Sequence, residues 1–169
     1  EYIEKAVFDS DVIANDYTIE NKYLKVVFDD KTGGIKSLVT KENGSEFVGG
    51  DSCVPTVIDN SEPDTWAHNI FKFDKVIGKM GRDSIELIEN GPARAVMRVK
   101  HTFGKSYLIQ DYILDTDSKI LRSKCRVLWQ EPLTILKMPV TVEGENPIST
   151  YEIPAGYIKR PCNGEEEPA

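Results

Sequence analysis

Apolar and polar side chains alternate along most of this 169-residue chain, from about Tyr17 to about Val142. A period of two is typical of strands with one buried face, whereas the three-to-four-residue spacing of amphipathic helices is almost absent. The clearest alternation lies between 93 and 103, where one face would carry Ala93, Ala95, Met97, Val99, His101 and Phe103. The pattern therefore predicts an all-β chain.

Short turn sequences separate the alternating segments. Four of them are DDKTGG (29–34), NGP (90–92), GK (104–105) and DTDS (115–118). Gly, Asn, Asp and Ser are residues that tight turns favour. Roughly nine or ten strands joined in this way, without intervening helices, describe an antiparallel sandwich. Several strands of about ten residues exceed the usual five or six, so the sequence predicts large sheets.

The last long strand, residues 119–129, alternates basic side chains with apolar ones. We expect its inward positions to be buried, namely Leu121, Cys125, Val127 and Trp129. Its outward positions would form a basic row of Arg122, Lys124 and Arg126. Such a row is most often a solvated face, and a docking surface for another domain is the alternative interpretation.

Composition and charge narrow the function classes. Hydrophobic residues make up 40% and charged residues 29% of the chain, which is typical of a globular protein. A net charge of −7 argues against nucleic acid as a partner, because a phosphate backbone requires an excess of Lys and Arg. No apolar run approaches the roughly 20 residues that span a bilayer, so we expect no membrane segment. The three separated cysteines predict free thiols.

The ends of the sequence suggest a fragment of a longer chain. It begins with Glu1 and shows no apolar leader, and it ends in the acidic segment NGEEEPA. We expect residues 1–16 to form an N-terminal linker or first strand, 17–161 the β-sandwich domain, and 162–169 an acidic tail. Free cysteines and the missing leader favour a cytoplasmic location.

The segment PDTWAHN, residues 63–69, holds the most distinctive candidate site. In an extended chain Asp64, Trp66 and His68 would project from one face, where an acid, an indole and an imidazole could meet a ligand or fix an irregular connection. Pro63 disfavours the helix on which Asp64 and His68 would become paired metal ligands.

Other catalytic chemistry has little support in the sequence. We identify no zinc-ligand spacing, nucleophile elbow or Cys–His signature. Acidic residues are numerous, and their number alone does not identify the carboxylate pair of a glycosidase. A sugar epimerase would need a general acid and a general base, for which His68 or His101 and Glu131 or Glu152 are candidates.

Segments from about Thr18 to about Pro161 resemble, in order, the C-terminal β-sandwich region of glycoside hydrolase family 38, the α-mannosidases. The resemblance rests on NKYLKVVFD with TGGIKSL (21–38), EPDTWAHN (62–69), NGPARA (90–95), LKMPV (136–140) and EIPAGYIKRP (152–161). It implies a large antiparallel supersandwich similar in fold to galactose mutarotase.

The resemblance also implies a division of function. In that family a separate N-terminal domain carries the zinc ion, the Asp nucleophile and the acid/base, and hydrolysis retains the anomeric configuration. No position here matches those motifs, so we expect no catalytic residue, metal ligand or cofactor in this chain. The expected partners are the N-terminal catalytic domain of the same polypeptide and mannose-containing glycans, with oligomerisation possible through the parent enzyme. A free-standing carbohydrate-binding sandwich and a mutarotase-like epimerase are the alternatives.

The resemblance changes the interpretation of the candidate residues. We expect Asp64, Trp66 and His68 to fix the connection after Pro63 or an interface, with the Trp66 ring buried. In the closing segment YEIPAGYIKRP we expect Glu152, Tyr157 and Arg160 to contact the catalytic domain, because polar loops at the edge of a rigid scaffold commonly carry interactions.

Overall fold

The computed structural model describes residues 10–50, 52–62, 66, 68 and 70–162, and this part of the chain contains strands and no helix. No described segment therefore qualifies as a membrane-spanning helix. The strands are β1 (Ile13–Asn15), β2 (Thr18–Glu20), β3 (Leu24–Phe28), β4 (Ile35–Thr40), β5 (Thr56–Asp59), β6 (Val76–Lys79), β7 (Gly81–Asn90), β8 (Arg94–Phe103), β9 (Ser106–Asp115), β10 (Leu121–Leu128), β11 (Thr134–Lys137), β12 (Ile148–Ile153) and β13 (Gly156–Pro161). The all-β prediction is confirmed.

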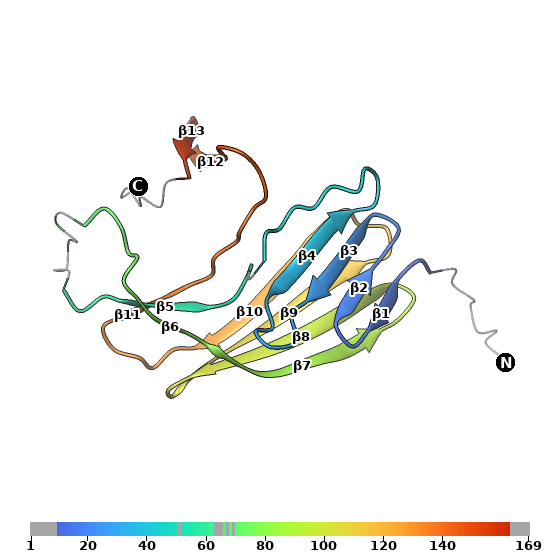
Figure 1. Cartoon of the computed structure of the whole chain (residues 1–169), viewed down its shortest axis with the longest axis horizontal. Coiled ribbons are helices and arrows are strands. Elements are labelled where there is room, and N and C mark those ends of the chain that lie inside the picture. The colour runs from blue at the N-terminus through green and yellow to red at the C-terminus, as the bar shows by residue number, and fades with distance from the viewer. Residues whose placement is uncertain (1–9, 51, 63–65, 67, 69, 163–169) are drawn as a thin grey trace.

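Two four-stranded antiparallel sheets form the main body. One has the order β1-β2-β3-β4 and the other the order β10-β9-β8-β7, and Figure 1 shows the first sheet lying across the second. The long strands β7, β8 and β9 are ten residues each, as the sequence predicts. The predicted antiparallel sandwich is confirmed. Its shortest strands, β1 and β2, have three residues each, too few for alternation to reveal.

The core lies between these two sheets. Four of the six predicted inward positions, Ala95, Met97, Val99 and His101, are buried. Phe103 is half-buried, and Ala93 is exposed because it precedes β8 in the turn. Side chains from β2 and β3, among them Ile19, Val26 and Phe28, pack against the buried positions. The Phe28 and Tyr112 rings meet with centroids 5.0 Å apart. Because burying one large apolar side chain contributes about 1.5–3 kcal/mol, this cluster supplies much of the stability of the fold.

The turn between β3 and β4 ties one sheet to the other. Asp29 Oδ1 accepts the backbone N–H groups of Lys31 and Thr32, which folds the turn onto itself. His101 Nε2 donates to the Thr32 carbonyl at 2.9 Å. Gly33 adopts a φ of 71°, and a Cβ there would lie 2.5 Å from the Val99 side chain. Glycine is therefore required both by the left-handed backbone and by the close approach to β8.

The outer face of the second sheet carries ion pairs between neighbouring strands. Arg98 binds Asp111 through two hydrogen bonds of 2.6 and 2.8 Å, and this guanidinium lowers the pKa of Asp111. Arg122 binds Asp115 at 2.6 Å. The basic row of β10 therefore faces outward as predicted, and two of its cations, Arg122 and Arg126, lie within ion-pair distance of acids of β9.

The predicted burial of β10 holds in part: Leu121 and Trp129 are half-buried and pack against the two hydrophobic clusters, whereas the predicted burial of Cys125 and Val127 is wrong. Cys125 pairs in register with Gln110 and Val127 with Leu108, so both project inward as expected. Both are nevertheless exposed, and Val127 has 55% of its surface accessible. The physical reason is that β10 is the edge strand of its sheet, so it has a neighbouring strand on one side only.

The remaining strands form two smaller sheets. β11-β5-β6 packs on a second cluster of Val57, Met80 and Leu108, which Trp129 partly covers. β12 and β13 pair only with each other among the described strands, and Figure 1 shows this hairpin standing apart from the sandwich.

Candidate functional site

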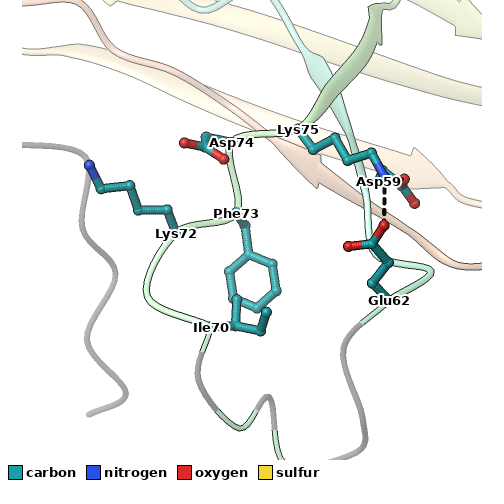
Figure 2. Close-up of a pocket in the computed structure, with 7 residues that line it drawn as sticks. All are labelled: Asp59, Glu62, Ile70, Lys72, Phe73, Asp74 and Lys75. Carbon is teal, nitrogen blue, oxygen red and sulfur yellow. Dashed lines mark hydrogen bonds and ion pairs between the residues drawn. The ribbon is translucent and has the colours of Figure 1, made fainter.

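A pocket of about 200 Å³ opens between the two arms of the loop that joins β5 to β6 (Figure 2). One arm continues from β5 through Asp59 to Glu62, and the other runs from Ile70 through Lys75 into β6. The backbone N–H of Asp59 donates to the Lys75 carbonyl at 2.9 Å and closes the base of the loop. The antiparallel pairing of β5 with β6 therefore positions the pocket.

Lys75 connects two carboxylates on the opposite arm. Its Nζ lies 2.8 Å from Asp59 Oδ2 and 3.1 Å from Glu62 Oε1. The hydrogen bond from Lys75, helped by the Ser61 backbone N–H at 2.9 Å, lowers the pKa of Asp59 to about 2. The same carboxylates raise the pKa of Lys75. Asp59 is therefore ionised and Lys75 protonated at neutral pH.

Phe73 and Ile70 form the apolar side of the pocket. Figure 2 shows the Phe73 ring projecting into the space between the arms, with the Ile70 side chain next to it. Lys137 at the end of β11 holds this arm, because its Nζ donates to the Phe73 carbonyl and lies 5.9 Å from the centre of the ring. The aromatic surface is therefore fixed before any ligand arrives.

The pocket is equipped for binding rather than for proton transfer. A general acid or base needs a pKa near the working pH, whereas ion pairing moves the pKa of Asp59 down and that of Lys75 up. A metal ion is also disfavoured, since the Lys75 ammonium already lies between the two carboxylates. Across the described residues, no three His, Cys, Asp or Glu side chains gather as metal ligands.

The segment PDTWAHN lies on the loop between the two arms of this pocket. Asp64 lies outside the described residues, whereas Trp66 and His68 are both exposed. Trp66 has 79% of its surface accessible, so the expected burial of its ring is wrong. The reason is local: Trp66 lies in a turn of the long connection between β5 and β6, and not in a strand covered by a second sheet. An interface role for the three residues stays a prediction.

The three candidates of the closing segment lie on the β12–β13 hairpin but not on one face. Glu152 pairs directly with Tyr157, so both side chains project from the same face. Arg160 pairs with Ser149 and projects from the opposite face, where its Cζ lies 5.6 Å from the centre of the Tyr151 ring. The structure therefore brings Glu152 and Tyr157 together and separates Arg160 from them.

His101 and Glu131 have structural roles that explain them without catalysis. His101 is fully buried, so its ring cannot contact a sugar. Glu131 Oε1 accepts the Lys105 backbone N–H at 2.8 Å and the Ser106 hydroxyl at 2.9 Å, which closes the turn between β8 and β9. This pair gives no support to an epimerase.

Sequence reasoning missed the pocket residues Asp59, Phe73 and Lys75. The sequence analysis predicts no strand at either place, whereas in the structure Asp59 ends β5 and Lys75 directly precedes β6, so antiparallel pairing places them opposite each other. Finding this pair required the register of β5 and β6, which shifts between Val57 and Ile58. An irregularity of this kind leaves no mark in the alternation of the sequence.

Comparison with known protein families identifies the family of this chain. The Glycosyl hydrolases family 38 C-terminal domain matches residues 19–168, a span that includes the second sheet, the pocket and the β12–β13 hairpin. A search of curated proteins finds no match. The family match covers far more than half of the 169 residues. The chain therefore belongs to glycosyl hydrolase family 38 and carries its C-terminal domain.

Proposed function

We propose that this chain is the accessory β-sandwich domain of an α-mannosidase that hydrolyses α-mannosidic bonds with retention. The observation that carries the proposal is the family match over residues 19–168. The substrates would be mannose-containing glycans, and the chemistry would be that of paired carboxylates forming and hydrolysing a glycosyl-enzyme intermediate.

The catalytic groups belong to a separate N-terminal domain in this proposal. The pocket beside β5 supports this division, because its Asp59 and Lys75 are both held in their charged states. The residues present do not fit a zinc ion, since no suitable ligand cluster lies within the described ranges. We therefore assign the zinc ion to the catalytic domain and no catalytic step to this chain.

The β12–β13 hairpin supplies the contact with that domain. Isolated two-stranded hairpins are marginally stable in water, so this one needs a partner to hold it. One of its faces carries Tyr151, Ile153 and Ile158 beside Arg160, and the three apolar side chains are all exposed. Aromatic residues and Arg are enriched at protein interfaces, and Arg can hold a carboxylate through two hydrogen bonds. This face is the proposed docking face.

The exposed inner side of β10 is a second candidate surface for this contact. Cys125 and Val127 are exposed there, opposite the buried inner residues Gln110 and Leu108 of the neighbouring strand β9. Long exposed edge strands with apolar side chains favour association, and proteins usually cover them. In the complete enzyme we expect the remainder of the polypeptide to cover this edge.

Hydrolysis by the full-length protein tests the proposed activity. It should cleave 4-nitrophenyl α-mannoside, and proton NMR should show the α-anomer of mannose as the first product. The 169-residue chain alone should hydrolyse nothing and bind no stoichiometric zinc. First release of the β-anomer, or about one tightly bound zinc per isolated chain, would contradict the proposal.

Arg160→Ala in the full-length protein tests the docking face. Because Arg160 projects from the proposed face, its loss should lower activity or the melting temperature of the full-length enzyme. Tyr157→Ala is the matched control, since Tyr157 lies on the opposite face of the same hairpin. A loss of activity or melting temperature in the Tyr157 variant alone would show that the Glu152–Tyr157 face docks instead. Unchanged activity and melting temperature in both variants would remove the hairpin from the interface.

A further inference from the structure

We propose that the pocket between residues 59–62 and 70–75 binds one hexopyranose ring of a glycan, away from the bond that is cleaved. The inference rests on the proposed function, because it concerns how the same substrate is held. It is carried by a juxtaposition: a fixed aromatic ring faces two carboxylates joined by an ammonium across a cavity of about 200 Å³.

The apolar side of the pocket suits the face of a sugar ring. A pyranose presents C–H groups on its faces and hydroxyl groups around its edge, so it pairs with surfaces that are aromatic on one side and polar on the other. The Phe73 ring projects into the cavity beside Ile70 (Figure 2). Since Lys137 holds Phe73 from outside the pocket, little ordering is needed on binding.

The charged wall suits the edge of a sugar ring. An ionised carboxylate accepts several hydrogen bonds, and Lys75 uses only part of this capacity on Asp59 and Glu62. Hydrogen bonds from hydroxyl groups to ionised carboxylates are stronger than those between neutral groups. Asp59 stays ionised above a pH of about 2, so this acceptor is present at every pH at which the protein functions.

Other ligand classes fit less well. Three acids, Asp59, Glu62 and Asp74, and two bases, Lys72 and Lys75, line the pocket, and their net negative charge disfavours phosphate, sulfate or acidic sugars. A metal cation is disfavoured because the Lys75 ammonium already lies between the carboxylates of Asp59 and Glu62. The volume lies below the roughly 300–1,000 Å³ of sites for larger organic ligands, which limits the occupant to about one ring.

Along the chain, Trp66 and His68 lie between the two arms, and both are exposed, with 79% of the Trp66 surface accessible. An exposed indole has a broad apolar face and a polar edge, which suits a second sugar residue of the same glycan. The proposal depends on the pocket and not on these two residues.

Phe73→Ala in the full-length enzyme tests the inference, with Phe71→Ala as the matched control. Phe71 lies two residues away, is 65% exposed and does not line the pocket. Phe73→Ala should raise KM for an α-linked mannotetraose about tenfold, whereas kcat and KM for 4-nitrophenyl α-mannoside stay unchanged. Phe71→Ala should leave both substrates unaffected. Equal KM values for the tetraose in the two variants would overturn the proposal.

A second variant and a direct binding measurement keep the test decisive if Phe73→Ala unfolds the loop. Glu62→Gln removes one acceptor charge from an exposed side chain, and it should weaken binding several-fold without changing the melting temperature. Calorimetric titration with a thio-linked α-mannotriose, which resists hydrolysis, measures binding even if neither substrate is turned over. Failure of hydrolysis then contradicts the proposed function, whereas unchanged binding of the thio-sugar in Glu62→Gln contradicts the pocket.

Discussion

The sandwich core and the β12–β13 hairpin are both built from paired antiparallel strands, but the inner side chains of the core are buried and those of the hairpin are exposed. Strand β8 pairs with β7 and β9, and its inner residues are buried beneath a second sheet. Strands β12 and β13 are equally regular and carry similar aromatic and branched side chains, yet these side chains remain exposed. Backbone pairing alone therefore does not produce a core. A second layer is needed, and under the proposed function the catalytic domain would supply it to the hairpin.

Removing one large side chain from each region should give the largest contrast. Met97→Ala deletes a fully buried side chain of β8 and should lower the free energy of unfolding by about 2–5 kcal/mol. Tyr157→Ala removes a larger side chain that is 68% exposed, and it should change stability by less than about 0.5 kcal/mol in the 169-residue chain. Urea denaturation of both variants measures the difference. Comparable losses would show that the hairpin has its own buried partner within this chain.

Adding one methyl group to a glycine in each region should give the next contrast. Gly33→Ala forces a non-glycine residue to a φ of 71° and places its Cβ 2.5 Å from Val99 Cγ1, so it should cost about 2–4 kcal/mol. Gly156 in the hairpin has no atom within 4 Å of such a Cβ, and Gly156→Ala should be nearly neutral. Thermal unfolding of the two variants tests this, and a neutral Gly33→Ala would contradict the tight docking of the turn.

The free energy of unfolding should depend on pH through His101, which lies in the sandwich core and not in the hairpin. Burial lowers the pKa of His101, assisted by the positive charge of Arg82, although its hydrogen bond to Thr32 opposes the shift. Because Nε2 donates to that carbonyl, the extra proton would go to Nδ1, which is buried and has no hydrogen-bond partner. The unfolded chain takes up this proton below a pH of about 6.5, so acid favours unfolding there.

The stability that neutral His101 contributes should therefore be complete above about pH 6.5 and decline as the pH falls toward the lowered folded-state pKa. His101→Gln keeps a donor for Thr32 and removes the titration, so its unfolding free energy should depend less on pH between 7 and 5. The hairpin contains no histidine and should add nothing to this difference. Parallel pH profiles of the variant and the unaltered chain would contradict this account.

The sequence predicts side-chain direction better than it predicts coverage. Alternation correctly placed Met97 and His101 inward on β8, because a period of two follows from strand geometry. It also correctly turned Cys125 and Val127 inward on β10, but their exposure depends on what packs against this edge strand. Such coverage is a property of tertiary packing, which no local pattern encodes.

The candidate site shows the same limit. The sequence drew attention to Trp66 and His68 because their residue types are rare in this chain, whereas the pocket is built from common residues such as Asp59 and Lys75. Asp59 and Lys75 come together only because β5 pairs with β6 in a register that contains an irregularity. The relative positions of Glu152, Tyr157 and Arg160 likewise required the hairpin register, which assigns them to opposite faces.

Thiol reactivity should reveal the smallest difference between the regions. The structure confirms that Cys53, Cys125 and Cys162 are free thiols. Cys53 is half-buried between the sheets, and this burial raises the pKa of its thiol, whereas Cys125 and Cys162 are exposed. Because the thiolate is the reactive form, a disulfide reagent at pH 8 should modify two thiols rapidly and Cys53 at least about tenfold more slowly.

Single Cys→Ser variants assign each reaction phase, and Cys53→Ser should remove only the slow one. The rates of thiol modification in the full-length enzyme then test whether the inner side of β10 and the end of the β12–β13 hairpin are covered there. Cys125 lies on the exposed inner side of β10 and Cys162 directly follows β13, so docking of the catalytic domain should slow both reactions. Three equal rates in the isolated chain would contradict the buried position of Cys53. Unchanged rates at Cys125 and Cys162 in the full-length enzyme would contradict the proposal that these surfaces are covered.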